Sequence, residues 1–415
     1  MKLSKPSQLF LASAIGLTLA TYLTACNIVT IDYVYVATSG GSSSGNSGQI
    51  YSYAADAETG ALRVAHAAIS SGGNSPVALA VDSSYSNLYV ANEASDTVVH
   101  FTVGSDGTLT QKDSLTTTEP PVAMAANAAG TYLYVLTGAA PSGCPPSGGS
   151  PATLTEYSLS SGSIGSAVAT EVLSLPGYAS DSLVPAALVT LPNSTGVYAA
   201  VYDASAYSPG CLSAVTSNAN PGWVFGFSVG SGGALAGTTN SPYPAGVKPS
   251  GMATDPTNRF VYVTDFASNE LVGYIVQSTN ELDFMVNGPF KTGNEPGSVV
   301  VDPRGIYLYV TNELDSTVSA YSISLPTGTP SAALATSGST SNQTDTQPVA
   351  ITLDPSLGRY VYTANHLGDS ISGFRLNPNT GVLQVTLAGP YPTGQGPTAI
   401  TAVPHGNHAI QTTAP

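Results

Sequence analysis

Leu88-Tyr89-Val90-Ala91-Asn92 decides the fold of this 415-residue chain, because the sequence contains seven variants of it. Each variant is a short run of mostly apolar residues with a tyrosine at the same place. The seven tyrosines are Tyr35, Tyr89, Tyr134, Tyr198, Tyr262, Tyr309 and Tyr362. A segment that recurs at a nearly regular interval is typical of a repeat architecture, so the repeat unit sets the fold.

Each repeat unit contains four strand-like pieces. The first piece begins with a proline, as in Pro76–Asp82, and the tyrosine segment is the second. The third carries an aromatic residue, such as Phe101, and the turn Asp106-Gly107-Thr108-Leu109 leads into the fourth. Runs of β-branched and aromatic residues between Gly, Asn and Asp predict strands. Four strands in a unit of about 40 to 50 residues predict a blade of a β-propeller.

The two ends of the chain fix the number of blades. The first tyrosine segment, at Tyr33, has no proline-led strand before it, whereas Pro397–Val403 is a proline-led strand with no tyrosine segment after it. An open ring would expose unpaired backbone groups, so we expect the last strand to complete the first blade. The predicted fold is all-β, a seven-bladed β-propeller with four antiparallel strands per blade, closed by the C-terminal strand. The tyrosines are expected in the core, each hydroxyl bonded to a buried partner, and Leu325–Gln347 is expected to form a long exposed loop.

The composition restricts the partners. Charged residues make up only 8% of the chain, far below the roughly 25% of an average soluble protein. The 25 Asp and Glu residues outnumber the 10 Lys and Arg residues, which gives a formal charge of −15. Such a chain is unsuited to nucleic acid and to anionic lipid surfaces, and its acidity mildly disfavours phosphorylated substrates.

The first 25 residues predict export. Lys2 and Lys5 precede the apolar run Leu9–Leu23, which is short for a membrane span of about 20 residues. The run ends in Leu23-Thr24-Ala25-Cys26, which resembles a bacterial lipoprotein signal. The resemblance implies that residues 1–25 are cleaved off, that acylated Cys26 anchors the protein in an outer or cell-surface membrane, and that residues 26–415 form one propeller in the cell envelope, on the periplasmic or cell-surface side. A plain secretory signal with an incidental cysteine is the alternative.

Two further cysteines, Cys144 and Cys211, lie in the insertions that follow the tyrosine segments of two consecutive blades. Outside the cytoplasm an even pair of cysteines is more often bridged than free. Because equivalent loops of neighbouring blades lie side by side, we predict a Cys144–Cys211 disulfide that fixes two long loops.

Tyr309-Val310-Thr311-Asn312 and its variants resemble the repeats of YVTN-type β-propellers. Together with the Asp-Pro turns at Asp255, Asp302 and Asp354, they make the chain similar to the lactonase-type seven-bladed propellers, the family of the bacterial 6-phosphogluconolactonase. The resemblance covers essentially the whole mature chain and implies lactone hydrolysis. Its motifs are structural, so they transfer no catalytic residue of the family to this sequence.

The candidate site follows from propeller geometry, in which the loop before the first strand and the loop after the second surround the central channel on one face. The candidate catalytic residues in these loops are Glu313, His366, Glu93, Asp265 and Glu295. Other residues of the same loops are Asn92, Asp203, Asn312, Asn365, Glu119, Lys248 and Lys291. Carboxylates with a histidine can act as general acid and base, or carboxylates can hold Ca²⁺ or Mg²⁺. A solvated acidic rim with neither role is the third interpretation.

Two features disfavour a phosphorylated lactone. Phosphate is bound best by convergent Arg or Lys, yet Arg259, Arg304 and Arg359 fall in turns on the opposite face. Such a substrate is also cytoplasmic, whereas this chain carries an export signal. Two hypotheses remain: a lipid-anchored, lactonase-like propeller that binds and hydrolyses a small neutral sugar lactone or related carbohydrate, and a non-catalytic surface module that binds a protein or polysaccharide. His405 and His408 form only a weak metal motif, and we expect a polar tail there.

Overall fold

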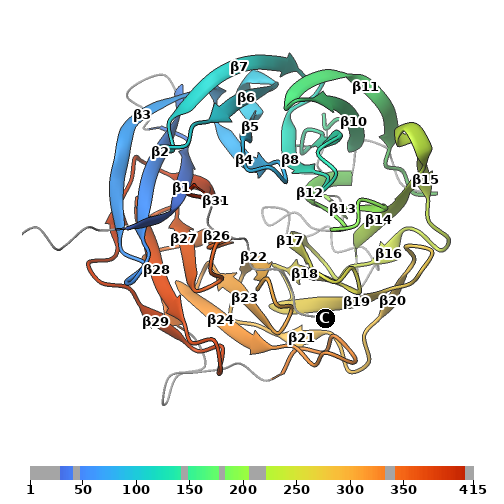
Figure 1. Ribbon diagram of the computed structural model, residues 1–415. Helices are drawn as coiled ribbons and strands as arrows, with labels where there is room; N and C mark the ends of the chain where they lie inside the picture. Colours follow the sequence, from blue (N-terminus) through green and yellow to red (C-terminus); the bar gives the residue numbers. More distant parts are fainter. Residues whose placement is uncertain are drawn as a thin grey trace, which may run out of the picture.

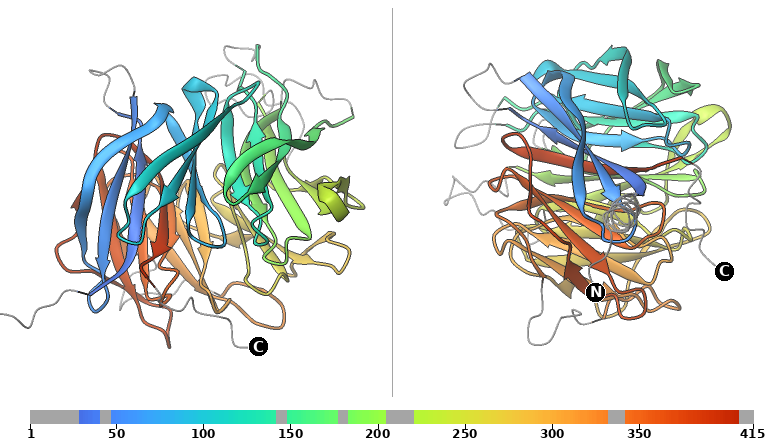
Figure 2. Two further views of the ribbon diagram at one scale, coloured as in Figure 1. Left: turned by 45° about the horizontal axis from the view of Figure 1, so that its top comes forward. Right: turned by 60° about the vertical axis from the view of Figure 1, so that its left-hand side comes forward.

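The computed structural model describes residues 29–40, 47–141, 148–176, 183–204, 221–331 and 342–406. These residues form seven antiparallel sheets arranged like blades around a central axis, seen face-on in Figure 1 and from two other directions in Figure 2. The all-β, seven-bladed propeller predicted from the repeats is confirmed.

The blades are numbered from the N-terminus, and each strand takes its place from the axis outward. The innermost strands are β31 (Pro397–Pro404), β4 (Pro76–Val81), β8 (Pro121–Ala126), β12 (Leu183–Thr190), β17 (Pro249–Thr254), β22 (Pro296–Val301) and β26 (Pro348–Leu353). The second strands carry the repeated tyrosines and are β1 (Thr30–Thr38), β5 (Asn87–Asn92), β9 (Tyr132–Thr137), β13 (Gly196–Asp203), β18 (Phe260–Asp265), β23 (Tyr307–Asn312) and β27 (Tyr360–Asn365). The third strands are β2 (Ser47–Asp56), β6 (Thr97–Val103), β10 (Thr153–Ser160), β14 (Gly222–Val229), β19 (Glu270–Val276), β24 (Thr317–Ser322) and β28 (Ser370–Leu376).

The outer strands differ most between blades. They are β3 (Leu62–Asn74), β7 (Leu109–Thr116), β11 (Ser163–Val172), β15 (Leu235–Gly237) with β16 (Tyr243–Pro244), β20 (Leu282–Phe284) with β21 (Phe290–Lys291), β25 (Asn342–Gln343), and β29 (Leu383–Val385) with β30 (Tyr391–Pro392). Blades 1 to 3 therefore end in long continuous strands, whereas in blades 4, 5 and 7 the outer position is shared by two short pieces.

The C-terminal strand closes the ring as predicted. β31 pairs with β1 in antiparallel register, with Tyr35 opposite Thr401, and so supplies the innermost strand of blade 1. Across the joint with blade 7, the hydroxyl of Ser356 donates to Oδ1 of Asp32 at 2.5 Å. Closure leaves no blade without an innermost strand.

The prediction that Leu325–Gln347 forms one exposed loop is wrong at the end of the segment and only partly right at its start, where Leu325 is exposed but Gly328 is buried. Near its start, the carbonyl of Gly328 accepts a buried hydrogen bond from Tyr262 at 2.6 Å. Near its end, β25 pairs with β24, with Val318 opposite Asn342. Blade 6 thus keeps a short fourth strand, which lacks the apolar run by which strands are recognised in a sequence.

The seven repeated tyrosines are fully buried, and six of them join neighbouring blades. Each of the six hydroxyls donates to a backbone carbonyl in the turn between the third and fourth strands of the next blade. The pairs are Tyr35 to Gly107 (2.8 Å), Tyr89 to Gly162 (2.7 Å), Tyr198 to Asn280 (2.8 Å), Tyr262 to Gly328 (2.6 Å), Tyr309 to Gly381 (3.0 Å) and Tyr362 to Gly60 (2.9 Å). The prediction of a buried partner is confirmed for these six and is wrong for Tyr134, whose hydroxyl has none among the described residues.

Aspartates close the turns between the first and second strands. Oδ1 of Asp302 accepts from the amides of Ile306 and Tyr307, and Asp255 and Asp354 make equivalent bonds. Arg259, Arg304 and Arg359 lie in these turns, at the end of the blade opposite to the turn between the second and third strands. The arginines are thus remote from the candidate face, as predicted.

Candidate functional site

The two predicted loops meet at one end of each blade, which we call the mouth. In six blades, the residue after the second strand donates its backbone N–H to the carbonyl of the residue before the innermost strand. These pairs are Ser39 to Gly396, Glu93 to Ser75, Gly138 to Pro120, Phe266 to Lys248, Glu313 to Glu295 and His366 to Gln347, at 2.8 to 3.0 Å. The propeller therefore holds a ring of equivalent positions around its axis, and the sequence decides which of them carry chemistry.

The backbone before the innermost strands is left-handed in several blades. Glu295 and Gln347 have φ of 55° and 59°, but so do Ser75 and Gly396, at 52° and 59°. A conformation shared by charged, amide, hydroxyl and glycine residues belongs to the turn itself. It is therefore no evidence that Glu295 is catalytic.

Glu313 is a half-buried carboxylate at the mouth. Its side chain lies over Gly297 of β22, where a Cβ would approach Oε1 to 2.3 Å, so the glycine makes room for the carboxylate. Nε2 of Gln347 donates to its Oε2 at 3.2 Å across the boundary between blades 6 and 7. Burial raises the pKa of Glu313, while the amide of Gln347 and the charge of Lys248 oppose the rise.

Lys248 places a cation beside this carboxylate. Its Nζ lies 4.0 Å from the centroid of the Phe266 ring and 5.9 Å from that of Tyr202, both within cation–π range. Burial lowers the pKa of Lys248, and the carboxylates of Glu313 and Glu295 counteract this effect. The ammonium group is thus held between aromatic rings and two acids.

His366 completes the cluster from blade 7. Its Nδ1 lies 3.0 Å from the carbonyl oxygen of Pro397. A carbonyl can only accept, so Nδ1 carries the hydrogen and a neutral ring keeps a free lone pair on Nε2. An imidazole fixed in this tautomer is suited to take a proton from water.

The structure brings together some of the predicted residues and separates others. Glu313, His366 and Glu295 lie on blades 6 and 7 with Lys248 next to them on blade 5, and the charge of Glu295 acts on both Glu313 and Lys248. Glu93 lies apart from them at the mouth of blade 2, where its side chain is exposed. Partial burial of its carboxyl group raises its pKa. Four of the five predicted candidates therefore form one cluster of three acids and bases plus a separate carboxylate.

Asp265 has a structural position. It is 1% exposed, and its two oxygens accept from the amides of Val247, Lys248, Ala267 and Ser268 at 2.8 to 3.3 Å. Its carboxylate thereby shapes the loop that carries Lys248.

The remaining residues of the predicted loops lie outside the cluster. Asn92, Asn312, Asn365 and Asp203 are buried in their blades, and Glu119 is half-buried. Lys291 belongs to β21, where its Nζ pairs with Glu270 at 2.7 Å. Of the two lysines expected on this face, only Lys248 therefore joins the acids of the mouth.

Several predictions fall on parts of the chain that the structure does not describe. Cys26, Cys144, Cys211 and His408 lie outside the described residues, so acylation, the disulfide and the histidine pair stay predictions. His405 is described, and its ring lies 5.3 Å from that of Tyr33.

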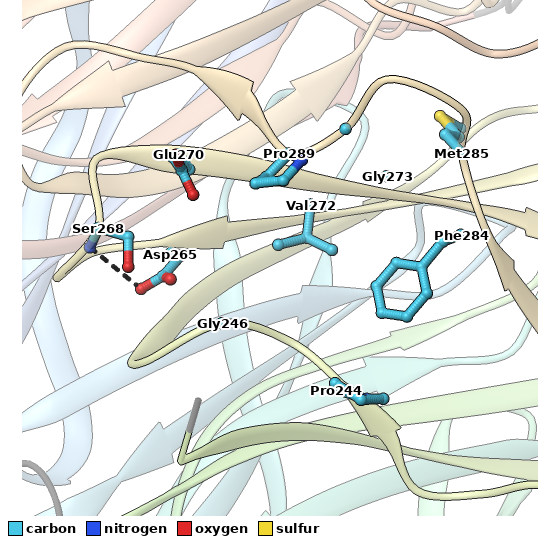
Figure 3. Close-up of a pocket in the computed structure, with 11 residues that line it drawn as sticks. Pro244, Gly246, Asp265, Ser268, Glu270, Val272, Gly273, Phe284, Met285 and Pro289 are labelled. Atoms are coloured by element: carbon cyan, nitrogen blue, oxygen red, sulfur yellow. Dashed lines mark hydrogen bonds between the residues drawn. The ribbon is translucent and has the colours of Figure 1, made fainter. Parts of the chain in front are cut away.

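A cavity of about 310 Å³ lies elsewhere, at the outer side of blades 4 and 5. Figure 3 shows Asp265 and Ser268 at one end of it and Phe284 and Met285 at the other, with Val272 between them. Its acids are already engaged, because Asp265 caps a loop and Glu270 pairs with Lys291. The mouth, rather than this cavity, brings acids and bases of three blades together, namely Lys248, Glu295, Glu313 and His366.

Sequence reasoning missed Gln347 and Phe266, which hold Glu313 and Lys248. Gln347 occupies in blade 7 the position of Glu295 in blade 6, and Phe266 occupies in blade 5 the position of Glu313. Equivalence within the repeat was the available signal. Candidates were chosen for ionisable side chains, so the amide of Gln347 and the phenyl ring of Phe266 were passed over.

The described residues include no group of three or more His, Cys, Asp or Glu side chains arranged to hold a metal ion. Within the same part of the chain, no helix has the length and apolar character needed to cross a membrane.

Comparison with known proteins gives one family and a common fold. A family model described as "Lactonase, 7-bladed beta-propeller" matches residues 15–140 and 234–411. No curated protein sequence matches the chain.

Solved structures are similar at low identity. The periplasmic gluconolactonase of Pseudomonas aeruginosa has a TM-score of 0.68 and 17% identity, over 92% of this chain and 100% of that one. A candidate 6-phosphogluconolactonase of Bacteroides fragilis has 0.69 and 17%, over 91% and 99%. A protein of unknown function from Desulfotomaculum acetoxidans has 0.62 and 16%, over 92% and 100%. Likeness at this identity establishes the fold alone.

Proposed function

The chain belongs to the lactonase family of seven-bladed β-propellers, and on that premise we propose that it is an exported lactone hydrolase acting on a neutral sugar lactone at the mouth of blades 5 to 7. The observation that carries this proposal is the convergence of Lys248, Glu313 and His366, with the His366 tautomer fixed by the Pro397 carbonyl. The similarity of the fold to a periplasmic gluconolactonase supports it.

Each group has a role in ring opening. Nε2 of His366 takes a proton from water while the water oxygen bonds to the lactone carbonyl carbon. The Lys248 ammonium stabilises the negative charge that develops on the carbonyl oxygen, and Glu313 keeps that amine charged. When the tetrahedral intermediate collapses, the ring C–O bond breaks and His366 returns its proton to the leaving alkoxide. The product is the open-chain hydroxy acid.

The charges of the mouth favour an uncharged substrate. The carboxylates of Glu313 and Glu295 already act on Lys248, and the three turn arginines lie at the other end of their blades. A phosphorylated lactone would bring a dianion to two carboxylates with one shared cation to pair with it. We therefore place gluconolactone-like, non-phosphorylated lactones first.

Export and anchoring belong to the same proposal. Lys2, Lys5 and the apolar run before Cys26 support cleavage and acylation at the cysteine. Together they put the enzyme in the cell envelope. Mass spectrometry of the protein from the membrane fraction tests this, because a diacylglyceryl group on Cys26 is expected, and an N-terminus at another residue would contradict it.

The decisive experiment is a pH-stat assay of residues 27–415, which include every described strand. The substrates are a panel of neutral and phosphorylated sugar lactones, with and without Ca²⁺ or Mg²⁺. We expect turnover of a neutral lactone, and a fall in kcat/KM of about 100- to 10,000-fold in His366→Ala, the magnitude of a lost general base. Glu58→Gln, which changes an exposed acid in a blade 1 turn, is the matched control. Turnover unchanged in His366→Ala would overturn the assignment of the site.

One observation favours the second candidate function, a non-catalytic module that binds a protein or polysaccharide. Leu314 and Leu367, directly after Glu313 and His366, are each 67% exposed and occupy equivalent positions in blades 6 and 7. Apolar side chains on the rim of a polar mouth suit a larger partner. No turnover on any lactone, together with polysaccharide binding that Leu314→Ser weakens, would establish this alternative.

A further inference from the structure

Glu156 is a buried carboxyl in the middle of blade 3. It lies on β10 directly opposite Tyr134 of β9 and is 0% exposed. Neither of its oxygens, nor the hydroxyl of Tyr134, makes a hydrogen bond of good geometry among the described residues. Buried polar atoms are almost always paired, so three unpaired oxygens in one place need an explanation.

The equivalent position in other blades shows what Glu156 changes. The residue opposite the repeated tyrosine is Ser52, Gly226, Gly273, Ala320 or Gly373 in blades 1, 4, 5, 6 and 7. Blade 2 has His100, but both ring nitrogens are bonded, to Asp113 at 3.0 Å and to Asn87 at 2.8 Å. Tyr89 beside it still reaches Gly162. Among the described residues, blade 3 is the one blade whose repeated tyrosine has no bond to the next blade.

Glu156 occupies the place of that missing bond. A Cβ on Gly233 would come within 2.0 Å of Oε1 of Glu156, so the carboxyl lies against this glycine. Gly233 is in the turn between β14 and β15 of blade 4, the position that accepts the tyrosine hydroxyl in other blades. The family model also leaves out residues 141–233, which contain Glu156 and this turn. The family model therefore does not cover the contact between blades 3 and 4 at Glu156.

We propose that the contact between blades 3 and 4 is a proton-sensitive joint, in which the neutral Glu156 carboxyl connects Tyr134 to the Gly233 turn and its ionisation loosens the two blades. A neutral carboxyl can accept from the tyrosine hydroxyl and donate to a carbonyl. An ionised carboxylate can only accept, so it can keep the hydroxyl of Tyr134 but cannot donate to a carbonyl of the Gly233 turn. A buried charge without an opposite charge beside it is strongly unfavourable.

The surroundings support this reading. The titratable groups near the carboxyl are Tyr134 and Tyr132 on β9, while Val168 of β11 and Gly233 of blade 4 bring no charge. Burial raises the pKa of Glu156 from 4.5 to about 7, and the Tyr134 hydroxyl only partly opposes the rise. The closed joint thus binds its proton more tightly than the open one. Its stability is complete below pH 4.5 and declines as the pH rises towards about 7.

A second buried acid lies at another contact between blades, so the measurement must report on each contact separately. Burial and the neighbouring Asp354 raise the pKa of Asp32 at the joint between blades 7 and 1, so global melting would mix two effects. Hydrogen exchange read by mass spectrometry, corrected for the pH dependence of chemical exchange, separates them. Peptides from β9, β10 and β14 report the joint, and peptides from β23 and β28 report the tyrosine-bonded contact between blades 6 and 7.

We expect protection of the blade 3 and 4 peptides to fall on the order of 50-fold between pH 5 and pH 9, with no such change in blades 6 and 7. Glu156→Gln keeps the shape of the side chain without its charge, and it should remove the pH dependence. An equal pH response in both regions, or a response that persists in Glu156→Gln, would overturn the proposal. If that variant does not fold, the wild-type comparison of the two regions still decides the question. Catalytic activity plays no part in the readout, so the proposal stands or falls independently of lactone hydrolysis.

Discussion

The contacts between blades 3 and 4 and between blades 6 and 7 are built on the same repeat but are held differently. Between blades 6 and 7, Tyr309 reaches the Gly381 carbonyl at 3.0 Å, and at the mouth Gln347 bonds to Glu313 at 3.2 Å. Between blades 3 and 4, Glu156 intervenes and leaves Tyr134 unbonded. The bond across a contact is thus present opposite small residues and opposite the fully bonded His100, and it is missing opposite the Glu156 carboxyl. The comparison also places the candidate site on the contact that is bonded at both ends.

The largest effect on stability is expected when the residues that distinguish the two contacts are exchanged. Ala320, opposite Tyr309, is 0% exposed, so Ala320→Glu puts a carboxyl where blade 6 has no room for one. We expect a loss in the free energy of unfolding of about 3 kcal/mol or more at pH 8, and a smaller loss at pH 5 where the carboxyl is neutral.

The reverse change, Glu156→Ala, removes the buried acid from blade 3. It leaves a space but no charge, so at pH 8 it should destabilise far less than Ala320→Glu. Urea midpoints at both pH values measure the pair. Equal destabilisation by the two changes would mean that volume, and not the proton, distinguishes the contacts.

The second prediction concerns a covalent connection across the weaker contact. Cys144 and Cys211 belong to insertions of blades 3 and 4, so the predicted disulfide would reinforce the pair of blades that lacks the tyrosine bond. We expect Cys144→Ser to lower the free energy of unfolding by about 2 to 4 kcal/mol, the usual effect of losing a disulfide. Loss of protection should concentrate in β9, β10 and β14.

Non-reducing peptide mapping checks the bridge directly, and Cys211→Ser is the matched variant that should behave identically. A free thiol on Cys144 in protein prepared under oxidising conditions would rule the bridge out.

The sequence predicted the features that repeat and missed those that occur once. Blade number, closure by Pro397–Val403 and the buried tyrosines followed from recurrence, because the same packing demand acts on every copy. β25 was missed because Asn342–Gln343 has no apolar pattern. The gap in the tyrosine bonds was missed because Glu156 lies in an otherwise ordinary strand, and only its register opposite Tyr134 gives it meaning.

The sequence predicted on which face of the propeller the candidate site lies, but not which residues of that face come together. Glu313, His366 and Glu295 were placed on the correct loops, whereas the separation of Glu93 and the loop-capping bonds of Asp265 depend on the blade order and on backbone amides. The roles of Gln347 and Phe266 depend on side-chain contacts across neighbouring blades, which spacing along the chain does not encode.

The smallest expected effects come from removing one tyrosine hydroxyl group at each of the two contacts. Tyr309→Phe removes a buried hydrogen bond and leaves the Gly381 carbonyl without its donor, which should lower the free energy of unfolding by about 1 to 2 kcal/mol. Tyr134→Phe removes a hydroxyl that donates to no described carbonyl of the next blade and has only the Glu156 carboxyl beside it, so its effect should be smaller than that of Tyr309→Phe. Matched denaturation curves of the two variants measure the difference.

Tyr309→Phe should also reduce lactone turnover, because Glu313 and His366 lie on the two blades that Tyr309 holds together, whereas Tyr134→Phe should leave turnover unchanged. Equal effects of the two substitutions on stability would show that the tyrosine bonds are incidental to the packing of the blades, and the contrast between the two contacts would then rest on Glu156 alone.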